Sequence, residues 1–208
     1  MARKASSQYS KQCFDKMKKV ILIGNGGHCK SIIDVIEQEA KYSIAGIVGP
    51  SKSVGTDLLG YKVIADDSEL QMLSRTYKYA LVAVGQIHSP KIRIKLFELL
   101  VKSGFILPSI VSPRAYVSKY ACIGIGTVIM HDAIVNANAV VGENCIINSK
   151  ALVEHDSIIH NHCHISTNAT INGGVIVGDG SFIGSGAVTV NSITLKNNSF
   201  IKAGALVK

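Results

Sequence analysis

The stretch from residue 129 to residue 165 reads IMHDAIVNANAVVGENCIINSKALVEHDSIIHNHCHI and repeats one pattern every six residues. An aliphatic residue recurs at Ile129, Val135 and Val141, and a small residue follows each of them four positions later. An α-helix repeats every 3.6 residues and a flat strand every two, so neither element explains this period. The period instead indicates a coiled repeat architecture.

The same register continues through the whole C-terminal half without an insertion. Sixteen of its seventeen aliphatic positions hold Val, Ile or Leu, and the positions are Val111, Val117, Ile123, Ile129, Val135, Val141, Ile147, Val153, Ile159, Ile165, Ile171, Val177, Ile183, Thr189, Leu195, Ile201 and Val207. Three hexads would form one triangular coil of about 18 residues, with coils stacked about 4.8 Å apart around a narrow aliphatic core. We therefore expect a parallel β-helix over residues 109–208.

The first half of the chain, residues 18–108, shows a different pattern. Its apolar residues predict three strands and two helices. The strands are residues 20–23, 43–48 and 80–84, and the helices are residues 31–39 and 92–101. This alternation predicts a small Rossmann-like α/β domain with parallel strands. Residues 1–17 are rich in Lys and Arg, and we expect them to form a mobile basic extension.

Composition limits the classes of partner. The formal net charge is +8, but much of it lies in the first 19 residues, so the remainder offers no basic footprint for a nucleic acid. No apolar run approaches the roughly 18 residues of a membrane span, and the N-terminus lacks the order of a signal peptide. The five cysteines are odd in number and include no C-x-x-C pair, so neither a disulfide framework nor a zinc ribbon is indicated. We expect a cytoplasmic protein without membrane insertion.

Four motifs in the two halves carry a resemblance to a known family. They are Val20-Ile-Leu-Ile-Gly-Asn-Gly-Gly-His28, Lys30-Ser-Ile-Ile-Asp34, Glu154-His-Asp156, and the segment from Ile165-Ser-Thr-Asn168 to Asn172-Gly-Gly174. With these motifs, residues 18–208 resemble the sialic acid O-acetyltransferase (NeuD) family, whose relatives include the bacterial amino-sugar N-acetyltransferases. The resemblance implies a left-handed β-helix, an acetyl-CoA-dependent sugar acetyltransferase, and a homotrimer with its active sites between subunits.

His155 is the candidate general base, which acetyl transfer needs to take the proton of the nucleophile. It stands two positions after the core residue Val153, and the equivalent positions one coil earlier and later hold Ala137 and Gly173, which leave room for a substrate. In the family the acid after this histidine orients the ring, so the resemblance assigns that role to Asp156. A surface histidine between two acids is the alternative interpretation.

Acetyl-CoA is the expected co-substrate. His164 takes a position that is otherwise bulky and apolar, and the resemblance implies that it contacts the acetyl end of the coenzyme. A structural histidine with a buried partner is the alternative. The family lines its coenzyme groove mainly with backbone groups, and the matching positions here are Asn148, Gly173, Ser185 and Ala203. The family's Gly-x-Pro-Ala-Lys segment, which helps to hold the coenzyme, has no match before Lys208.

The glycine-rich loop after the first strand is the candidate substrate-binding site. Gly24, Gly26, Gly27 and His28 lie between a strand and a helix, a place suited to phosphate, although a tight packing turn is the alternative. The dinucleotide fingerprint is incomplete, so a dehydrogenase is disfavoured. In the N-acetyltransferase relatives this loop and its histidine hold a nucleotide-linked sugar, and an acidic pair after the second strand reads uracil. Gly49-Pro50 stands near the place of that pair, so uridine recognition does not follow.

A zinc site must also be weighed, because the γ-class carbonic anhydrases share this β-helix and bind zinc through three histidines. They need two histidines five residues apart and a third about two coils earlier. His155 and His160 have the first spacing, but Lys119 stands at the third position. Three protein ligands are the minimum for such a site, so we expect no metal.

These observations predict an acetyl-CoA-dependent acetyltransferase that acts on a sugar. The first hypothesis is N-acetylation of a nucleotide-linked deoxy-amino sugar for bacterial surface glycan synthesis. The second is O-acetylation of a sialic acid, which the missing acidic pair favours somewhat. A hypothesis of another class is a non-catalytic β-helix binding module, and His155 and His164 at the family spacing count against it.

Overall fold

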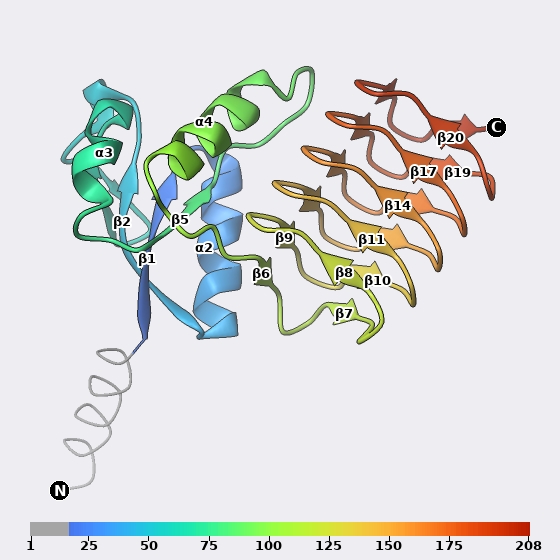
Figure 1. The fold of residues 1–208 in the computed structure, drawn as a ribbon, viewed down its shortest axis with the longest axis horizontal. Helices are drawn as coiled ribbons and strands as arrows, with labels where there is room; N and C mark the ends of the chain where they lie inside the picture. Colours follow the sequence, from blue (N-terminus) through green and yellow to red (C-terminus); the bar gives the residue numbers. More distant parts are fainter. Residues whose placement is uncertain (1–16) are drawn as a thin grey trace, which may run out of the picture.

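The computed structural model describes residues 17–208, so the predicted basic extension lies almost entirely outside the described residues. The first half of the chain forms an α/β unit, and the second half forms a stack of triangular coils with the C-terminus at its far end (Figure 1). Within residues 17–208, the helices are too short or too polar to cross a membrane. Both predicted architectures are therefore present.

The α/β unit is built on a five-stranded sheet with the order β3-β4-β2-β1-β5. Its strands are β1 (Lys18–Ile23), β2 (Tyr42–Val48), β3 (Asp57–Leu58), β4 (Tyr61–Ala65) and β5 (Tyr79–Val82). All pairings are parallel except the hairpin between β3 and β4. The three predicted strands are confirmed. The hairpin was not predicted, because β3 is only two residues long and β4 lacks a clear apolar–polar alternation.

Helices cover both faces of this sheet. The long helices are α2 (Gly27–Glu39) and α4 (Lys91–Lys102), and the short ones are α3 (Leu70–Leu73) and the 3₁₀ turns η1 (Ser51–Ser53) and η2 (Asp67–Glu69). Successive residues of β1 point to opposite faces, so Val20 and Leu22 pack in the core of α2. Ile21 and Ile23 pack in the core that contains α3 and α4. Both predicted helices are confirmed, each a few residues longer than predicted.

The β-helix has three flat faces of six, six and five strands. Face 1 holds β6 (Ile110–Val111), β9 (Val128–Ile129), β12 (Ile146–Ile147), β15 (His164–Ile165), β18 (Phe182–Ile183) and β21 (Phe200–Ile201). Face 2 holds β7 (Tyr116–Val117), β10 (Ile134–Val135), β13 (Leu152–Val153), β16 (Thr170–Ile171), β19 (Val188–Thr189) and β22 (Leu206–Val207). Face 3 holds β8 (Cys122–Ile123), β11 (Val140–Val141), β14 (Ile158–Ile159), β17 (Ile176–Val177) and β20 (Thr194–Leu195).

The hexad register sets which side chains enter the β-helix. Each strand pairs in parallel with the strand one coil later, as in Ile134 with Leu152, which confirms the predicted three-hexad coil. The aliphatic residues point inward, and Val141 is 1% exposed. The residue before each of them points outward, and Val140 is 40% exposed. The small residues also face the core, as Ala133 does.

Every corner from residue 126 to residue 204 contains one residue in the left-handed conformation, directly before the position that is mostly small, with Val175 and Ile193 as the exceptions. The left-handed residues are Gly126, Asp132, Asn138, Asn144, Lys150, Asp156, His162, Asn168, Gly174, Gly180, Gly186, Ser192, Asn198 and Gly204. Gly, Asn and Asp tolerate this conformation best, which explains why they fill most of the positions. The candidate residue Asp156 is thus also a corner residue of the fold.

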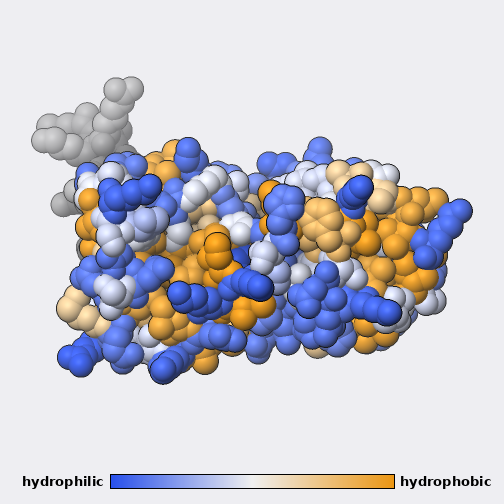
Figure 2. All heavy atoms as spheres, turned by 90° about the horizontal axis from the view of Figure 1, so that it is seen from above, coloured by the Kyte–Doolittle hydropathy of each residue, from blue (hydrophilic) through white to orange (hydrophobic). Residues whose placement is uncertain are grey.

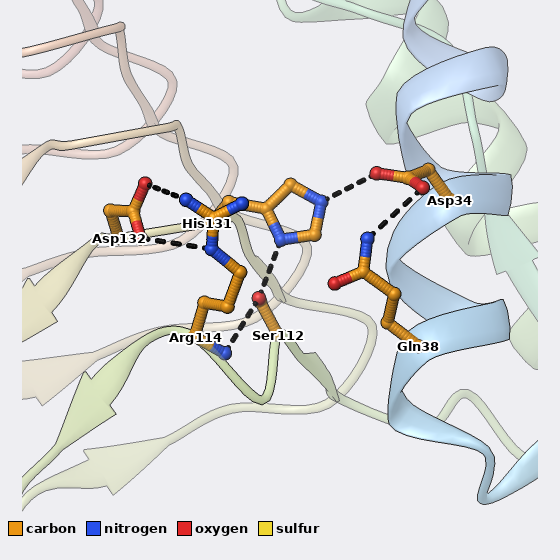
Figure 3. A network of polar contacts seen from close by, with 6 residues as sticks. All are labelled: Asp34, Gln38, Ser112, Arg114, His131 and Asp132. Carbon is orange, nitrogen blue, oxygen red and sulfur yellow. Dashed lines mark hydrogen bonds and ion pairs between the residues drawn. The ribbon is translucent and has the colours of Figure 1, made fainter.

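The α/β unit packs against the first coils through face 1. Ile110, Val128 and Met130 of the β-helix share one buried core with α2. Beside this core, His131 Nε2 lies 2.7 Å from Asp34 Oδ2 of α2, and His131 Nδ1 lies 2.7 Å from Ser112 Oγ (Figure 3). These contacts join residues far apart in sequence and fix the two parts relative to each other.

Arg93 of α4 makes a second, buried connection and is only 1% exposed. Its guanidinium donates to the carbonyl oxygens of Val82 and Val84 and, at 2.7 Å, to the side-chain oxygen of Asn144 in the β-helix. Burial lowers the pKa of Arg93 to about 10. None of the ion pairs within residues 17–208 involves this cation. Carbonyl oxygens therefore accept from both terminal nitrogens of the guanidinium, whereas its Nε has no partner among the described residues.

The register makes a direct prediction about stability. We expect Val141→Ala to lower the free energy of unfolding by about 1.5–3 kcal/mol, because it removes two buried carbon groups worth about 0.8 kcal/mol each and leaves a cavity. Val140→Ala is the matched control, because it makes the same change at the outward position of the same strand. Chemical denaturation of both variants measures the difference. Equal losses would contradict the inward and outward assignment.

Candidate active site

A cavity of about 790 Å³ lies where the α/β sheet meets face 1 of the β-helix. The carboxyl ends of the parallel strands line it in sheet order: Asp67 after β4, Pro50 after β2, the loop 24–28 after β1, and residues 85–87 after β5. The β-helix contributes Asn148 and His164. Ligands of parallel α/β sheets bind at this edge, and the volume is typical of a small-molecule site.

The glycines of the loop have different structural roles. Gly24 has φ of +115°, and a Cβ there would lie 2.6 Å from Val84 Cγ2, so a larger residue does not fit. Gly26 and Gly27 border open space, where a Cβ would meet no atom within 4 Å. Helix α2 begins at Gly27 without a side-chain cap. Its first amide groups are therefore free to bind an anion beside these glycines.

Two buried polar atoms in the cavity lining lack a partner among the described residues: His28 Nε2 and Gln86 Oε1. Burial lowers the pKa of His28 to about 3, and the charge of Arg93 contributes further. The imidazole is therefore neutral near pH 7. Because buried polar atoms in proteins are normally hydrogen-bonded, these two atoms indicate a polar ligand.

His164 belongs to the same cavity and is 7% exposed. Its Nδ1 donates to the carbonyl oxygen of Gln86 at 2.5 Å, and its Nε2 accepts from the Asn148 amide at 3.1 Å. Burial lowers the pKa of His164 to about 4, so the ring is neutral and its tautomer is set by these two bonds. This partnered ring fits the structural interpretation of His164, while its place in the cavity wall keeps it beside a bound ligand.

His155 lies on the exposed corner between β13 and β14. Its Nδ1 lies 2.7 Å from Asp156 Oδ2, and Asn138 from the preceding coil donates to the other carboxylate oxygen at 2.7 Å. The bond to Asp156 raises the pKa of His155, and the bonds from Asn138 and His155 lower the pKa of Asp156. With Nδ1 donating, Nε2 of the neutral ring is free to accept a proton.

Gly173 lies directly beside the His155 ring, as the spacing of one coil predicts. A Cβ at this position would lie 2.8 Å from His155 Cε1 and 2.9 Å from Nε2. Any larger residue would displace the imidazole. The glycine therefore provides the space in which His155 adopts its position.

The predicted catalytic and coenzyme-binding residues lie on two different edges of the β-helix. His155 and Gly173 lie on the edge between faces 2 and 3, which is opposite face 1. Asn148, Ser185 and Ala203 lie on the edge between faces 1 and 2. The cavity adjoins face 1, and His155 is not among its lining residues. One chain therefore does not bring His155 to its own cavity.

Three polar residues at or near the cavity were not predicted: Asp67, Gln86 and Arg93. Asp67 follows the unpredicted hairpin. Gln86 follows β5, and the rule that ligands bind at strand ends could have identified it. Charged residues are normally exposed, but the spacing of Arg93 to Phe97 and Leu100 is helical and could have identified it as a residue of the buried face of α4.

Metal-ligating side chains are dispersed in the structure. Among residues 17–208, no group of three His, Cys, Asp or Glu side chains could hold a metal ion. His155 is bonded to Asp156, and His131 is bonded to Asp34 and Ser112.

Two family models match the chain. Residues 19–100 match the PglD N-terminal domain, and residues 156–191 match the bacterial transferase hexapeptide model with its six repeats. Among curated proteins, no sequence matches. The first match covers the α/β unit that carries the glycine loop, and the second covers the coils around His164 and Gly173.

Solved structures resemble the whole chain. A histidine-to-asparagine mutant of perosamine N-acetyltransferase from Caulobacter crescentus, in complex with CoA and GDP-perosamine, is 30% identical, with a TM-score of 0.86 over 91% of this chain and 88% of that one. The acetyltransferase domain of PglB from Neisseria gonorrhoeae FA1090, in complex with acetyl coenzyme A, is 31% identical, with a TM-score of 0.83 over 92% and 93%. WeeI from Acinetobacter baumannii AYE shares the fold, with 19% identity and a TM-score of 0.70 over 92% and 97%.

These matches agree with the arrangement of the two parts and with the motifs that each part carries. The β-helix is the left-handed one of the hexapeptide acetyltransferases. The chain belongs to the family of sugar N-acetyltransferases that place a PglD-type N-terminal domain before a hexapeptide-repeat β-helix.

Proposed function

We propose that this protein transfers the acetyl group of acetyl-CoA to the amino group of a nucleotide-linked amino sugar, with His155 as the general base. The observation that carries the proposal is the cavity, which joins the glycine loop of the α/β unit to His164 and Asn148 of the β-helix. The related enzyme bound to CoA and GDP-perosamine supports the same pair of ligands.

The glycine loop supports a nucleotide-linked substrate. The open space at Gly26 and Gly27 leaves room for phosphates at the first amide groups of α2. A free sialic acid carries no diphosphate for such a site. The loop therefore favours N-acetylation over the alternative of O-acetylation, and the neutral His28 offers a further polar contact to the same ligand.

The chemistry at His155 follows from its hydrogen bonds. The amino nitrogen of the sugar attacks the thioester carbonyl carbon, and His155 Nε2 takes the proton that this nitrogen loses. Asp156 holds the ring in the required tautomer and stabilises the imidazolium that forms. The tetrahedral intermediate then collapses, its carbon–sulfur bond breaks, and the proton held by His155 passes to the sulfur, so that CoA leaves as a thiol. Asn148, Gly173, Ser185, Ala203 and His164 are proposed to hold the coenzyme.

A homotrimer with the active site between subunits is part of this proposal. The edges that carry His155 and the coenzyme residues flank face 2, so a neighbouring subunit packed there would bring the edges together. Face 2 presents exposed apolar residues at Tyr116, Ile134, Val188 and Leu206. Apolar patches are visible on the surface of the β-helix half (Figure 2). Such surfaces are typical of subunit interfaces.

We expect His155→Ala to lower kcat at least about 100-fold, the low end for loss of a general base, while the protein keeps its fold. Release of free CoA thiol in the presence of an amino-sugar nucleotide measures the rate. His160→Ala is the control, because His160 is exposed on the same coil and makes no side-chain hydrogen bond within the described residues. An unchanged rate for His155→Ala would remove the assignment.

The Asp156 contact predicts a shift in the pH profile. The rate rises with pH as His155 loses its proton, and Asp156 raises the pKa of His155. We expect Asp156→Asn to move the midpoint of this rise to lower pH and to reduce the plateau, because the imidazolium loses its partner. Asp132→Asn makes the same change at a left-handed corner residue on the edge between faces 1 and 2, away from His155, and should leave the midpoint in place. A midpoint unaffected by Asp156→Asn would refute the role of this acid.

The shared site predicts complementation between inactive variants. His155→Ala removes the base, and Gly26→Trp fills the cavity at a position whose φ of −87° accepts any residue. Each variant alone should be inactive. We expect the co-expressed mixture to recover about a quarter of the wild-type activity, because random assembly pairs an intact base with an intact cavity at one contact in four. No recovery in a mixed trimer, or a monomer by light scattering, would exclude the shared site.

A further inference from the structure

Asp67 is the single carboxylate among the described residues that line the cavity. Both carboxylate oxygens of its neighbour Asp66 are already hydrogen-bonded, one to Ser51 Oγ and the other to the amide and hydroxyl of Ser68. Within residues 17–208, Asp67 has neither a hydrogen bond nor an ion pair through its side chain. It therefore presents two free acceptor oxygens at the cavity wall.

The position of Asp67 is set by the order of the sheet. β4, which precedes it, lies on the far side of β2 from the glycine loop, and β5 lies on the opposite side of β1. Across the cavity the order is Asp67, Pro50, the loop 24–28, Gln86 and finally His164. Adjacent strands are about 4.8 Å apart, so the span from β4 to β5 is about 14 Å. A base, a diphosphate and a sugar fit this line in that sequence.

Two buried polar atoms of the same cavity lining have no hydrogen-bond partner among the described residues. Gln86 is 2% exposed, and its Oε1 has no partner among the described residues. His28 Nε2, on the neighbouring loop, is also buried without a partner among the described residues. Burial and the charge of Asp66 raise the pKa of Asp67, although Lys95 opposes this. The cavity lining therefore contains two buried atoms whose hydrogen bonds a ligand would complete, together with the exposed carboxylate of Asp67, which is free to accept.

We infer that Asp67 selects the base of the nucleotide-linked substrate and that this base is guanine, an inference that rests on the proposed function. Guanine places its N1–H and one N2–H side by side, and the two oxygens of a carboxylate accept both. The diphosphate then lies at Gly26 and Gly27, and the sugar extends toward His164. Asp67 thus takes the place of the acidic pair that is missing after β2.

The other bases fit a lone carboxylate less well. Uracil and thymine have one N–H between two carbonyl oxygens, and these oxygens would face the negative charge of Asp67. Adenine and cytosine present a ring nitrogen lone pair beside their amino group, which repels one carboxylate oxygen. Among these bases, guanine alone offers two neighbouring donors that one carboxylate can accept together, with its O6 acceptor lying outside that pair. The choice follows from donor and acceptor positions alone.

Calorimetric titration of the full chain with nucleoside diphosphates, without acetyl-CoA, tests this inference. We expect GDP to bind at least about tenfold more tightly than UDP or ADP, the lower range for one paired contact to a base. IDP retains N1–H but lacks the amino group, so it should bind with intermediate affinity. In Asp67→Asn the side-chain amide would face the guanine amino group. GDP should therefore weaken at least about tenfold while UDP and ADP stay unchanged.

Glu98→Gln is the control, because it removes one negative charge from the exposed side of α4, outside the cavity lining. It should leave all four affinities unchanged, and thermal melting should show that both variants remain folded. Equal binding of GDP and UDP to the wild type would overturn the inference. So would an equal loss of all nucleotides in Asp67→Asn, or no binding of any nucleoside diphosphate.

The test separates this inference from the proposed function. Acetyl transfer to a uridine-linked but not a guanosine-linked amino sugar would refute the role of Asp67 and leave the acetyltransferase proposal in place. Asp67-dependent binding of GDP without acetyl transfer to any guanosine-linked amino sugar would refute the acetyltransferase proposal and leave the base assignment in place.

Discussion

The parallel stacking of one coil on the next is the constraint on which the rest of this structure depends. Each aliphatic residue packs on its equivalent one coil away, and the strands pair in register. The register fixes every other position of the hexad as inward, outward or corner. It therefore places His155 at a corner, Gly173 directly beside it, and Asn138 within reach of Asp156. A one-residue slip would disperse all of these contacts.

A second constraint, the buried joint between the two parts, builds the cavity. Arg93 holds Asn144 of the β-helix, while Gln86 holds His164, so strand-end loops and coils form one wall. Burial keeps both His28 and His164 neutral, which leaves Asp67 as the charged group in the described lining. The proposed substrate site is thus beside face 1, whereas the proposed base is on the opposite edge. Chemistry would require a second subunit.

The sequence predicted most of the fold because its signals are periodic. The hexad register gave the coils and the position of His155 relative to Gly173, and the strand–helix alternation gave the main elements of the α/β unit. The missed features depend on tertiary contacts. Asp67 follows a hairpin that is too short to show a period. Arg93 is buried although charged residues are normally exposed, so its residue type gives no sign of its position. The separation of His155 from the cavity follows from coil geometry, which the motifs alone do not show.

The central claim is that His155 of one subunit acts on a ligand bound at the cavity of another. A structure of the assembled protein with CoA bound tests it most directly. The account predicts that the CoA sulfur lies beside His164 of one subunit. It also predicts that His155 Nε2 of the neighbouring subunit lies within about 4 Å of that sulfur, or one hydrogen-bonded group further away. A coenzyme held entirely by one chain, with its sulfur far from any His155, would contradict the account.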